Sequence, residues 1–135
     1  MVQGGKGGYE RLEVYQRAMS LIPRVQFVIR VLPASERYAL ASQMRRASRS
    51  VPTNIAEGYA KRKSAKEFRN YLTIAMGSAS EMKVHLAIAN ELGYLHEGDD
   101  LIEQYDILGR KLNKLITSWG AGAPEPLNQR RTTNN

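Results

Sequence analysis

Cysteine is absent from this chain of 135 residues. Its absence excludes disulfide bonds, thiolate metal sites and cysteine nucleophiles, and it fits the reducing cytoplasm, where we expect the protein to work. Long apolar runs are missing as well, because no stretch approaches the roughly 18 residues that a membrane span needs. Residues 1–8 hold four glycines and no apolar segment, so we expect a flexible leader there and not a signal peptide.

Signatures of catalysis are also scarce. The two histidines, His85 and His96, have no metal-ligand spacing, and His85 follows Glu81 by four residues, as in a surface pair on a helix. Asp99 and Asp100 are adjacent, which suits the start of a helix better than acid–base chemistry. No phosphate loop, nucleophile elbow or dinucleotide fingerprint occurs. The sequence therefore predicts a protein that is not an enzyme and that holds no metal or cofactor.

Positive charge, in contrast, is concentrated in one block. Between Arg37 and Arg69, nine lysines and arginines stand against two acids, Glu57 and Glu67, so this block alone accounts for the formal net charge of +7. Such a block is typical of a surface that binds a polyanion, most often nucleic acid. We therefore predict that RNA or DNA contacts its nine cations: Arg37, Arg45, Arg46, Arg49, Lys61, Arg62, Lys63, Lys66 and Arg69. Interleaved tyrosines would stack on the bases: Tyr38, Tyr59 and Tyr71.

Two other uses of these charges stay open. They can pair with acids within a chain or between subunits, and the segment from Glu97 to Asp106 offers five acids and no base. Alternatively, they form a solvated face that keeps the protein soluble. Arg46 has Glu57 and Glu81 as candidate partners across helices, and such a pair would be structural.

Apolar residues recur with helical spacing in four segments, at about residues 9–32, 35–58, 64–93 and 99–119. Ser35 and Ser64 are the predicted N-caps of the second and third segments, and Ser64 belongs to a capping box. Gly93 closes the third segment. Four amphipathic helices with short connections predict an all-α fold, an antiparallel up-and-down four-helix bundle over residues 9–119. We expect a disordered tail over residues 120–135.

The inward stripe of each helix follows from the same spacing. The predicted stripes are Leu12, Tyr15, Met19, Ile22, Gln26 and Ile29; Leu40, Met44, Ala47, Val51 and Ile55; Phe68, Leu72, Ala75, Ala79, Met82, Leu86 and Ala89; and Leu101, Tyr105, Leu108, Leu112 and Leu115. Pro23 and Pro52 lie inside two of the helices and should bend them. The polar residues around Pro52 either satisfy its unpaired carbonyl or shape a ligand notch. Gly77 lies among small residues, which would let a neighbouring helix approach closely.

Several motifs together resemble one bacterial family. They are the block from Gln43 to Gly58 (QMRRASRSVPTNIAEG), the run from Phe68 to Ser78 followed by Glu81, the residues from Glu91 to Leu95, and those from Leu12 to Ala18. Over about residues 9–118 the chain is similar to the four-helix-bundle family of proteins encoded in large-subunit ribosomal RNA intervening sequences.

This resemblance implies a compact up-and-down bundle that associates into a ring-shaped homopentamer. A distant relative, the accessory variability determinant of diversity-generating retroelements, partners a reverse transcriptase and binds nucleic acid through a basic surface. The function that we expect is therefore non-enzymatic nucleic-acid binding. The alternative is an interaction scaffold whose basic face docks an acidic partner or a reverse transcriptase.

Overall fold

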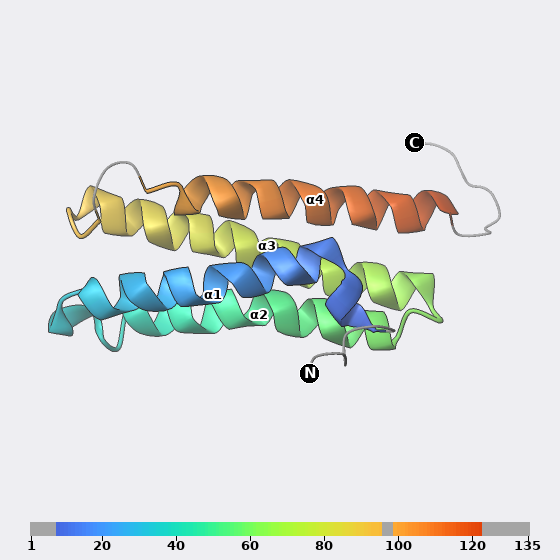
Figure 1. Cartoon of the computed structure of the whole chain (residues 1–135), viewed down its shortest axis with the longest axis horizontal. Coiled ribbons are helices and arrows are strands. Elements are labelled where there is room, and N and C mark those ends of the chain that lie inside the picture. Colours follow the sequence, from blue (N-terminus) through green and yellow to red (C-terminus); the bar gives the residue numbers. More distant parts are fainter. Residues whose placement is uncertain (1–7, 96–98, 123–135) are drawn as a thin grey trace.

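Four long helices make up the fold. The computed structural model describes residues 8–95 and 99–122, and it contains the helices α1 (Glu13–Val31), α2 (Leu40–Ala60), α3 (Ala65–Glu91) and α4 (Leu101–Gly122) and the short 3-10 turns η2 (Tyr9–Arg11) and η3 (Ala34–Glu36). The helices lie lengthwise beside one another, with the α2–α3 turn at one end and the α1–α2 connection at the other (Figure 1). This is the antiparallel up-and-down bundle that the sequence predicts.

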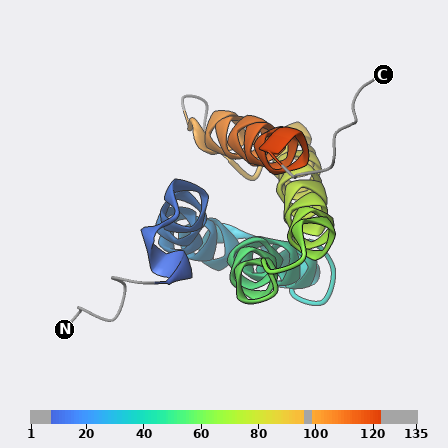
Figure 2. The ribbon, with the colours of Figure 1, turned by 90° about the vertical axis from the view of Figure 1, so that its right-hand side faces the viewer.

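The helices follow one another around the bundle axis. Seen end-on, α1 lies diagonally across from α3, and α2 lies across from α4 (Figure 2). The contacts of α2 with α3 and of α3 with α4 are the most extensive, whereas α1 and α4 touch least. The fourth side of the bundle, between α1 and α4, is therefore its loosest seam.

Short-range signals set most helix ends. Ser64 caps α3, because its Oγ accepts a hydrogen bond from the Glu67 N–H at 3.1 Å. Gly93, with φ of 79°, closes α3, and the Tyr94 N–H then donates to the Ala89 carbonyl at 2.9 Å. At the start of α4, Asp99 Oδ1 accepts from the Leu101 N–H at 2.7 Å.

The predicted N-cap at Ser35 is wrong. Ser35 lies within η3, and α2 begins only at Leu40. Glu36 explains the later start, because its Oε1 accepts from the Leu40 N–H at 3.3 Å and its Oε2 accepts from the Tyr94 hydroxyl at 3.0 Å. A tertiary contact to the segment after α3 thus holds the turn in place, and the sequence around Ser35 carries no sign of it.

The core confirms the predicted stripes of three helices. All the predicted stripe residues of α2 and α3 are buried, as are Leu101, Tyr105, Leu108 and Leu112 of α4, while Leu115 is half-buried. His85, predicted as part of a surface pair, is also buried.

The helices α1 and α2 continue across their prolines. Near Pro52, Asn54 Nδ2 donates to the backbone carbonyl of Ser50 at 2.9 Å, and Ser78 Oγ donates to Ser50 Oγ at 2.9 Å.

The predicted stripe of α1 is only partly right, because Ile29 is buried and Leu12 and Tyr15 pack against the core, whereas Met19 is exposed. The buried residues of the helix are Val14, Ala18, Leu21, Val25, Val28 and Ile29. The helix leaves Met19 and Phe27 exposed, with 44% and 59% of their surface accessible. Since α1 has apolar residues on two faces, periodicity alone does not say which face turns inward.

Two further expectations concern Gly77 and the chain ends. A Cβ at Gly77 would meet no atom within 4 Å, so no helix of the described chain packs closely against it. Helix α4 continues to Gly122, beyond the predicted start of the tail at residue 120. Residues 1–7 and 123–135, with most of the predicted leader and tail, lie outside the described residues, as do His96 and Glu97.

Candidate nucleic-acid interface

The predicted cations lie along α2 and around the turn that follows it. Arg45, Arg46 and Arg49 come from the first half of α2, and Arg37 precedes that helix. Lys61, Arg62 and Lys63 form the α2–α3 turn, and Lys66 and Arg69 open α3. Because α2 has 21 residues, the two groups together extend along its whole length, which is about 30 Å at ~1.5 Å per residue.

Close contact between α2 and α3 positions the turn. A Cβ at Gly58 would lie 2.7 Å from Tyr71 Cβ and 3.0 Å from Phe68 Cδ1, so only glycine lets the backbones approach this closely. Phe68 also meets Trp119 of α4 edge-on, with ring centroids 4.7 Å apart. The cationic turn therefore projects from a tightly packed end of the bundle.

Two tyrosines shape the cations of the turn. The guanidinium of Arg62 lies 3.9 Å from the ring centroid of Tyr59 and donates to the Tyr59 carbonyl at 2.9 Å. Lys61 Nζ donates to the Tyr71 hydroxyl at 3.0 Å, and this hydrogen bond raises the pKa of Lys61. Tyr59 and Tyr71 are thus engaged by cations, whereas Tyr38 is 88% exposed.

Arg46 makes the contact that a structural role requires. Its Nη2 lies 2.9 Å from Glu81 Oε2 on α3, although 65% of the arginine side chain stays exposed. The other candidate partner, Glu57, lies 3.9 Å from Lys61 instead. Glu81 also accepts from His85 at 3.1 Å, so one carboxylate joins α2 to α3.

Three acids just before and within α4 pair with cations outside the block. Asp99 and Asp100 contact Arg24 of α1, and Asp106 contacts Lys83 and Arg110. The hydrogen bond from Arg24 lowers the pKa of Asp100, and that from Lys83 lowers the pKa of Asp106. Both carboxylates are thereby held ionised by cations from outside the predicted block.

Most of the block is consequently left without a carboxylate partner. Among residues 8–95 and 99–122, only Arg46 and Lys61 of the nine cations have a carboxylate oxygen within 4.0 Å. The other seven have none there: Arg37, Arg45, Arg49, Arg62, Lys63, Lys66 and Arg69. Arg45 and Arg69 are half-buried, and the other five are exposed.

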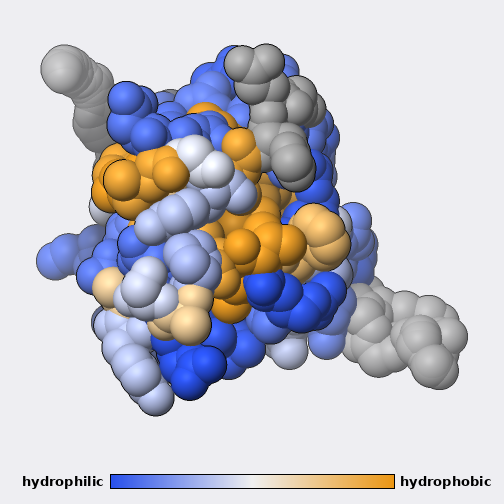
Figure 3. Space-filling view, turned by 90° about the vertical axis from the view of Figure 1, so that its left-hand side faces the viewer, coloured by the Kyte–Doolittle hydropathy of each residue, from blue (hydrophilic) through white to orange (hydrophobic). Residues whose placement is uncertain are grey.

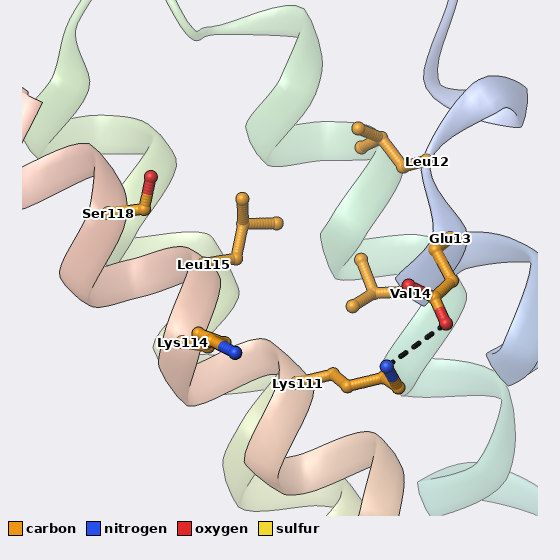
Figure 4. A pocket seen from close by; sticks show the side chains of 7 residues that line it. All are labelled: Leu12, Glu13, Val14, Lys111, Lys114, Leu115 and Ser118. Atoms are coloured by element: carbon orange, nitrogen blue, oxygen red, sulfur yellow. Dashed lines mark ion pairs between the residues drawn. The ribbon is translucent and has the colours of Figure 1, made fainter.

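A groove adds further cations at the same end of the bundle as the turn. It has a volume of about 450 Å³ and lies between the start of α1 and the end of α4, where Val14 and Leu115 contribute apolar walls (Figure 4). Glu13 crosses it to meet Lys111 at 3.1 Å. Lys114, on the same wall, has no carboxylate within 4.0 Å in the described part of the chain.

Residues 10–114 match the family described as 23S rRNA-intervening sequence protein. The chain belongs to this family. No curated protein matches it. The matched span includes all nine predicted cations and ends at Lys114, so the family unit is the four-helix bundle together with its basic block.

The sequence prediction for this family member did not include the two lysines of the groove. Lys111 and Lys114 lie more than forty residues after the block, and the fold places them in the groove between the start of α1 and the end of α4. Their sequence signal is the basic stretch from Arg110 to Lys114, a pattern that also complements the dipole of a helix near its C-terminal end. None of the described helices contains a stretch long and apolar enough to cross a membrane.

Proposed function

We propose that this protein binds nucleic acid, RNA or DNA, without catalysing a reaction. The observation that carries the proposal is that seven of the nine cations between Arg37 and Arg69 lack a carboxylate partner among the described residues. Phosphate groups would supply the missing anions, and arginine forks suit them especially well. The family description, which refers to an intervening sequence of ribosomal RNA, supports a role connected with nucleic acid.

The spacing of the cations favours contact along a backbone. They extend over the length of α2, about 30 Å at ~1.5 Å per residue, which is close to the ~34 Å of one duplex turn. Phosphate contacts of this kind fix position and carry no direct sequence information. We therefore expect binding that depends little on sequence, with the exposed Tyr38 available to stack on an unpaired base.

We further propose that the protein acts in the cytoplasm as a ring-shaped homo-oligomer, most simply a homopentamer. Apolar residues stay exposed on the outer face of α1 (Met19, Phe27 and Val31) and on that of α3 (Ile74, Val84, Ile88 and Leu92). Since α1 and α3 lie diagonally opposite each other (Figure 2), the two faces point away from one another. A contact from the α1 face of one subunit to the α3 face of the next is head-to-tail, and such contacts form a ring when the rotation between neighbouring subunits closes. A ring would repeat the basic surface and raise its avidity.

The test replaces cations that no described carboxylate holds. The triple variant Arg49→Gln, Lys63→Gln and Lys66→Gln removes three exposed charges, and it should weaken binding to a short RNA or DNA duplex by about tenfold or more. The control, Arg17→Gln, Arg24→Gln and Arg110→Gln, removes three cations that pair with acids outside the block. Fluorescence anisotropy measures both, and circular dichroism checks the helical content. Equal losses in the two variants would show that net charge matters and the basic block does not.

The exposed α3 face beside Arg46 also favours the alternative, an interaction scaffold for an acidic protein or a reverse transcriptase. A duplex that fails to bind at low salt, together with a protein partner that stays bound after nuclease treatment, would favour the scaffold. A measurement of the protein's mass in solution after nuclease treatment reports whether it self-associates without nucleic acid.

A further inference from the structure

Three arginines from separate elements line one small pocket beside the α1–α2 connection. Arg30 comes from the last turn of α1, Arg37 follows η3, and Arg45 comes from the second turn of α2. The pocket has a volume of about 190 Å³, and apolar residues such as Leu32 and Ala41 complete its wall. It lies at the end of the bundle opposite the α2–α3 turn, an end where strongly hydrophilic residues border an apolar centre (Figure 3).

No acid neutralises these arginines within residues 8–95 and 99–122. None of the three has a carboxylate oxygen within 4.0 Å there, and Arg30 instead lies 5.9 Å from the ring centroid of Phe27. The acid next to Arg37, Glu36, is held by the Leu40 N–H and the Tyr94 hydroxyl. Three like charges around one cavity repel each other, and a bound anion would turn that repulsion into attraction.

Hydrogen bonds order the backbone of the α1–α2 connection before any anion binds. Consecutive hydrogen bonds run from the Glu36 N–H to the Pro33 carbonyl at 2.9 Å, from the Arg37 N–H to Ala34 at 3.0 Å and from the Ala39 N–H to Glu36 at 3.1 Å. The pocket therefore needs no ordering of its backbone when an anion enters, which lowers the cost of binding.

Volume and charge together identify the ligand class. We infer that the pocket formed by Arg30, Arg37 and Arg45 binds the phosphate group of a phosphomonoester. A volume of about 190 Å³ equals roughly six waters at ~30 Å³ each, enough for a phosphate group and its hydration. It is below the roughly 300 Å³ at which pockets begin to enclose whole drug-sized ligands, so the rest of the molecule lies outside.

A terminal phosphate suits this pocket better than an internal phosphodiester. A phosphomonoester carries a charge of about −1.5 to −2 at neutral pH. Only one ester bond connects its phosphate to the rest of the ligand, which can therefore extend out of the pocket in one direction. An internal phosphodiester carries one charge, and the nucleic-acid chain attached to it must extend out of the pocket in two directions. The phosphate can belong to a small molecule or to the phosphorylated end of a nucleic acid, and the experiment distinguishes these sources.

The experiment titrates the whole protein with inorganic phosphate, then with adenosine monophosphate, and then with oligonucleotides that carry either a phosphate or a hydroxyl at the 5′ end. Arginine Nε–Hε signals in NMR spectra report the site, with chloride at matched ionic strength as the reference. We expect saturable shifts for Arg30, Arg37 and Arg45 with inorganic phosphate, with adenosine monophosphate and with the 5′-phosphorylated oligonucleotide. Shifts that chloride reproduces, or that fall on other arginines, would overturn the inference.

Variants give a second readout. Arg37→Gln with Arg45→Gln should weaken phosphate binding by at least about tenfold, whereas the control Arg17→Gln with Arg110→Gln, which removes the same charge outside both the pocket and the basic block, should leave it nearly unchanged. Equal losses would contradict the inference. If the pocket variant loses helicity, Arg45→Lys, which keeps the charge but loses the fork, should still weaken phosphate binding, and an unchanged affinity would count against the site.

This inference is independent of the proposed function, because inorganic phosphate alone tests it. A protein that binds phosphate but no duplex would refute the proposed function only. A protein that binds duplex but neither inorganic phosphate nor adenosine monophosphate would refute the pocket only. A 5′-phosphorylated oligonucleotide that binds more tightly than its hydroxyl form would assign the pocket to nucleic-acid ends, and tighter binding of adenosine monophosphate than of both oligonucleotides would assign it to small molecules.

Discussion

Glu81 connects side chains from two directions, Arg46 of α2 and His85 of its own helix. Its Oε2 lies 2.9 Å from Arg46 Nη2 and 3.1 Å from His85 Nε2. Burial raises the pKa of Glu81, but the hydrogen bonds from His85 and Arg46 outweigh burial and leave the pKa below its ordinary value of 4.5. The ionised form is therefore favoured by folding, so it stabilises the fold above pH 4.5. That stabilisation is lost as the pH falls through the lower pKa of the folded state.

Glu81→Gln tests this account. The variant should have a lower free energy of unfolding near neutral pH, by up to about 1 kcal/mol because the pair is partly exposed. The difference should shrink as the pH falls below 4.5, since Glu81 of the natural chain then becomes neutral as well. Urea unfolding at several pH values and one protein concentration measures it. A difference that is the same at every pH would show that the charge of Glu81 contributes nothing.

At the scale of single elements, α2 and α3 approach each other closely at Gly58. A Cβ there would lie 2.7 Å from Tyr71 Cβ, whereas a Cβ at Gly77 of α3 would meet nothing within 4 Å. Glycine is thus required at the first position for packing, and at the second it only lowers helix propensity.

Gly58→Ala and Gly77→Ala should therefore act in opposite directions. We expect Gly58→Ala to lower the free energy of unfolding by about 1–3 kcal/mol, as overpacking does. Gly77→Ala should raise it by up to about 1 kcal/mol. Chemical denaturation at matched protein concentration compares the two. If Gly58→Ala is as stable as Gly77→Ala, the close approach at the cationic turn is not needed.

The four helices differ in how well the sequence predicts their buried faces. Three stripes could be predicted because, in α2, α3 and α4, the apolar residues that recur every three or four positions without interruption are the ones in the core. The face of α1 could not, because its large residues Met19 and Phe27 lie outside the core and the smaller Ala18 and Val25 lie within it. The late start of α2 depends on Tyr94, which is distant in sequence from Glu36.

The candidate interface was predictable in composition and less so in detail. The charge block could be counted directly, and Glu81 was one of two candidate partners of Arg46. The choice of Glu81 over Glu57, and the engagement of Lys61 by Tyr71, depend on how α2 and α3 pack. Arg30 was missed, because it precedes the block in sequence and joins Arg37 only through the fold.

At the scale of the whole molecule, the two apolar faces make a specific prediction about assembly. A head-to-tail contact uses the α1 face of one subunit and the α3 face of the next. Phe27→Ser damages only the first face and Ile88→Ser only the second, and both residues are exposed in the single chain. Each variant alone should therefore be monomeric.

Mixing the two variants should give a different result. The intact α1 face of the Ile88→Ser subunit can meet the intact α3 face of the Phe27→Ser subunit, and neither remaining face can extend the chain. Analytical ultracentrifugation should show a heterodimer and no larger ring. A mixture that stays monomeric, or a single variant that still forms the full oligomer, would contradict head-to-tail assembly.

The most direct test of the central claim, that the unpaired cations of the block contact phosphates, is the salt dependence of duplex binding. If about six phosphates are neutralised, a plot of the logarithm of affinity against that of salt concentration should have a slope near −5. The variant Arg49→Gln, Lys63→Gln and Lys66→Gln should flatten it by about three units. An affinity that does not change between low and moderate salt would contradict the account.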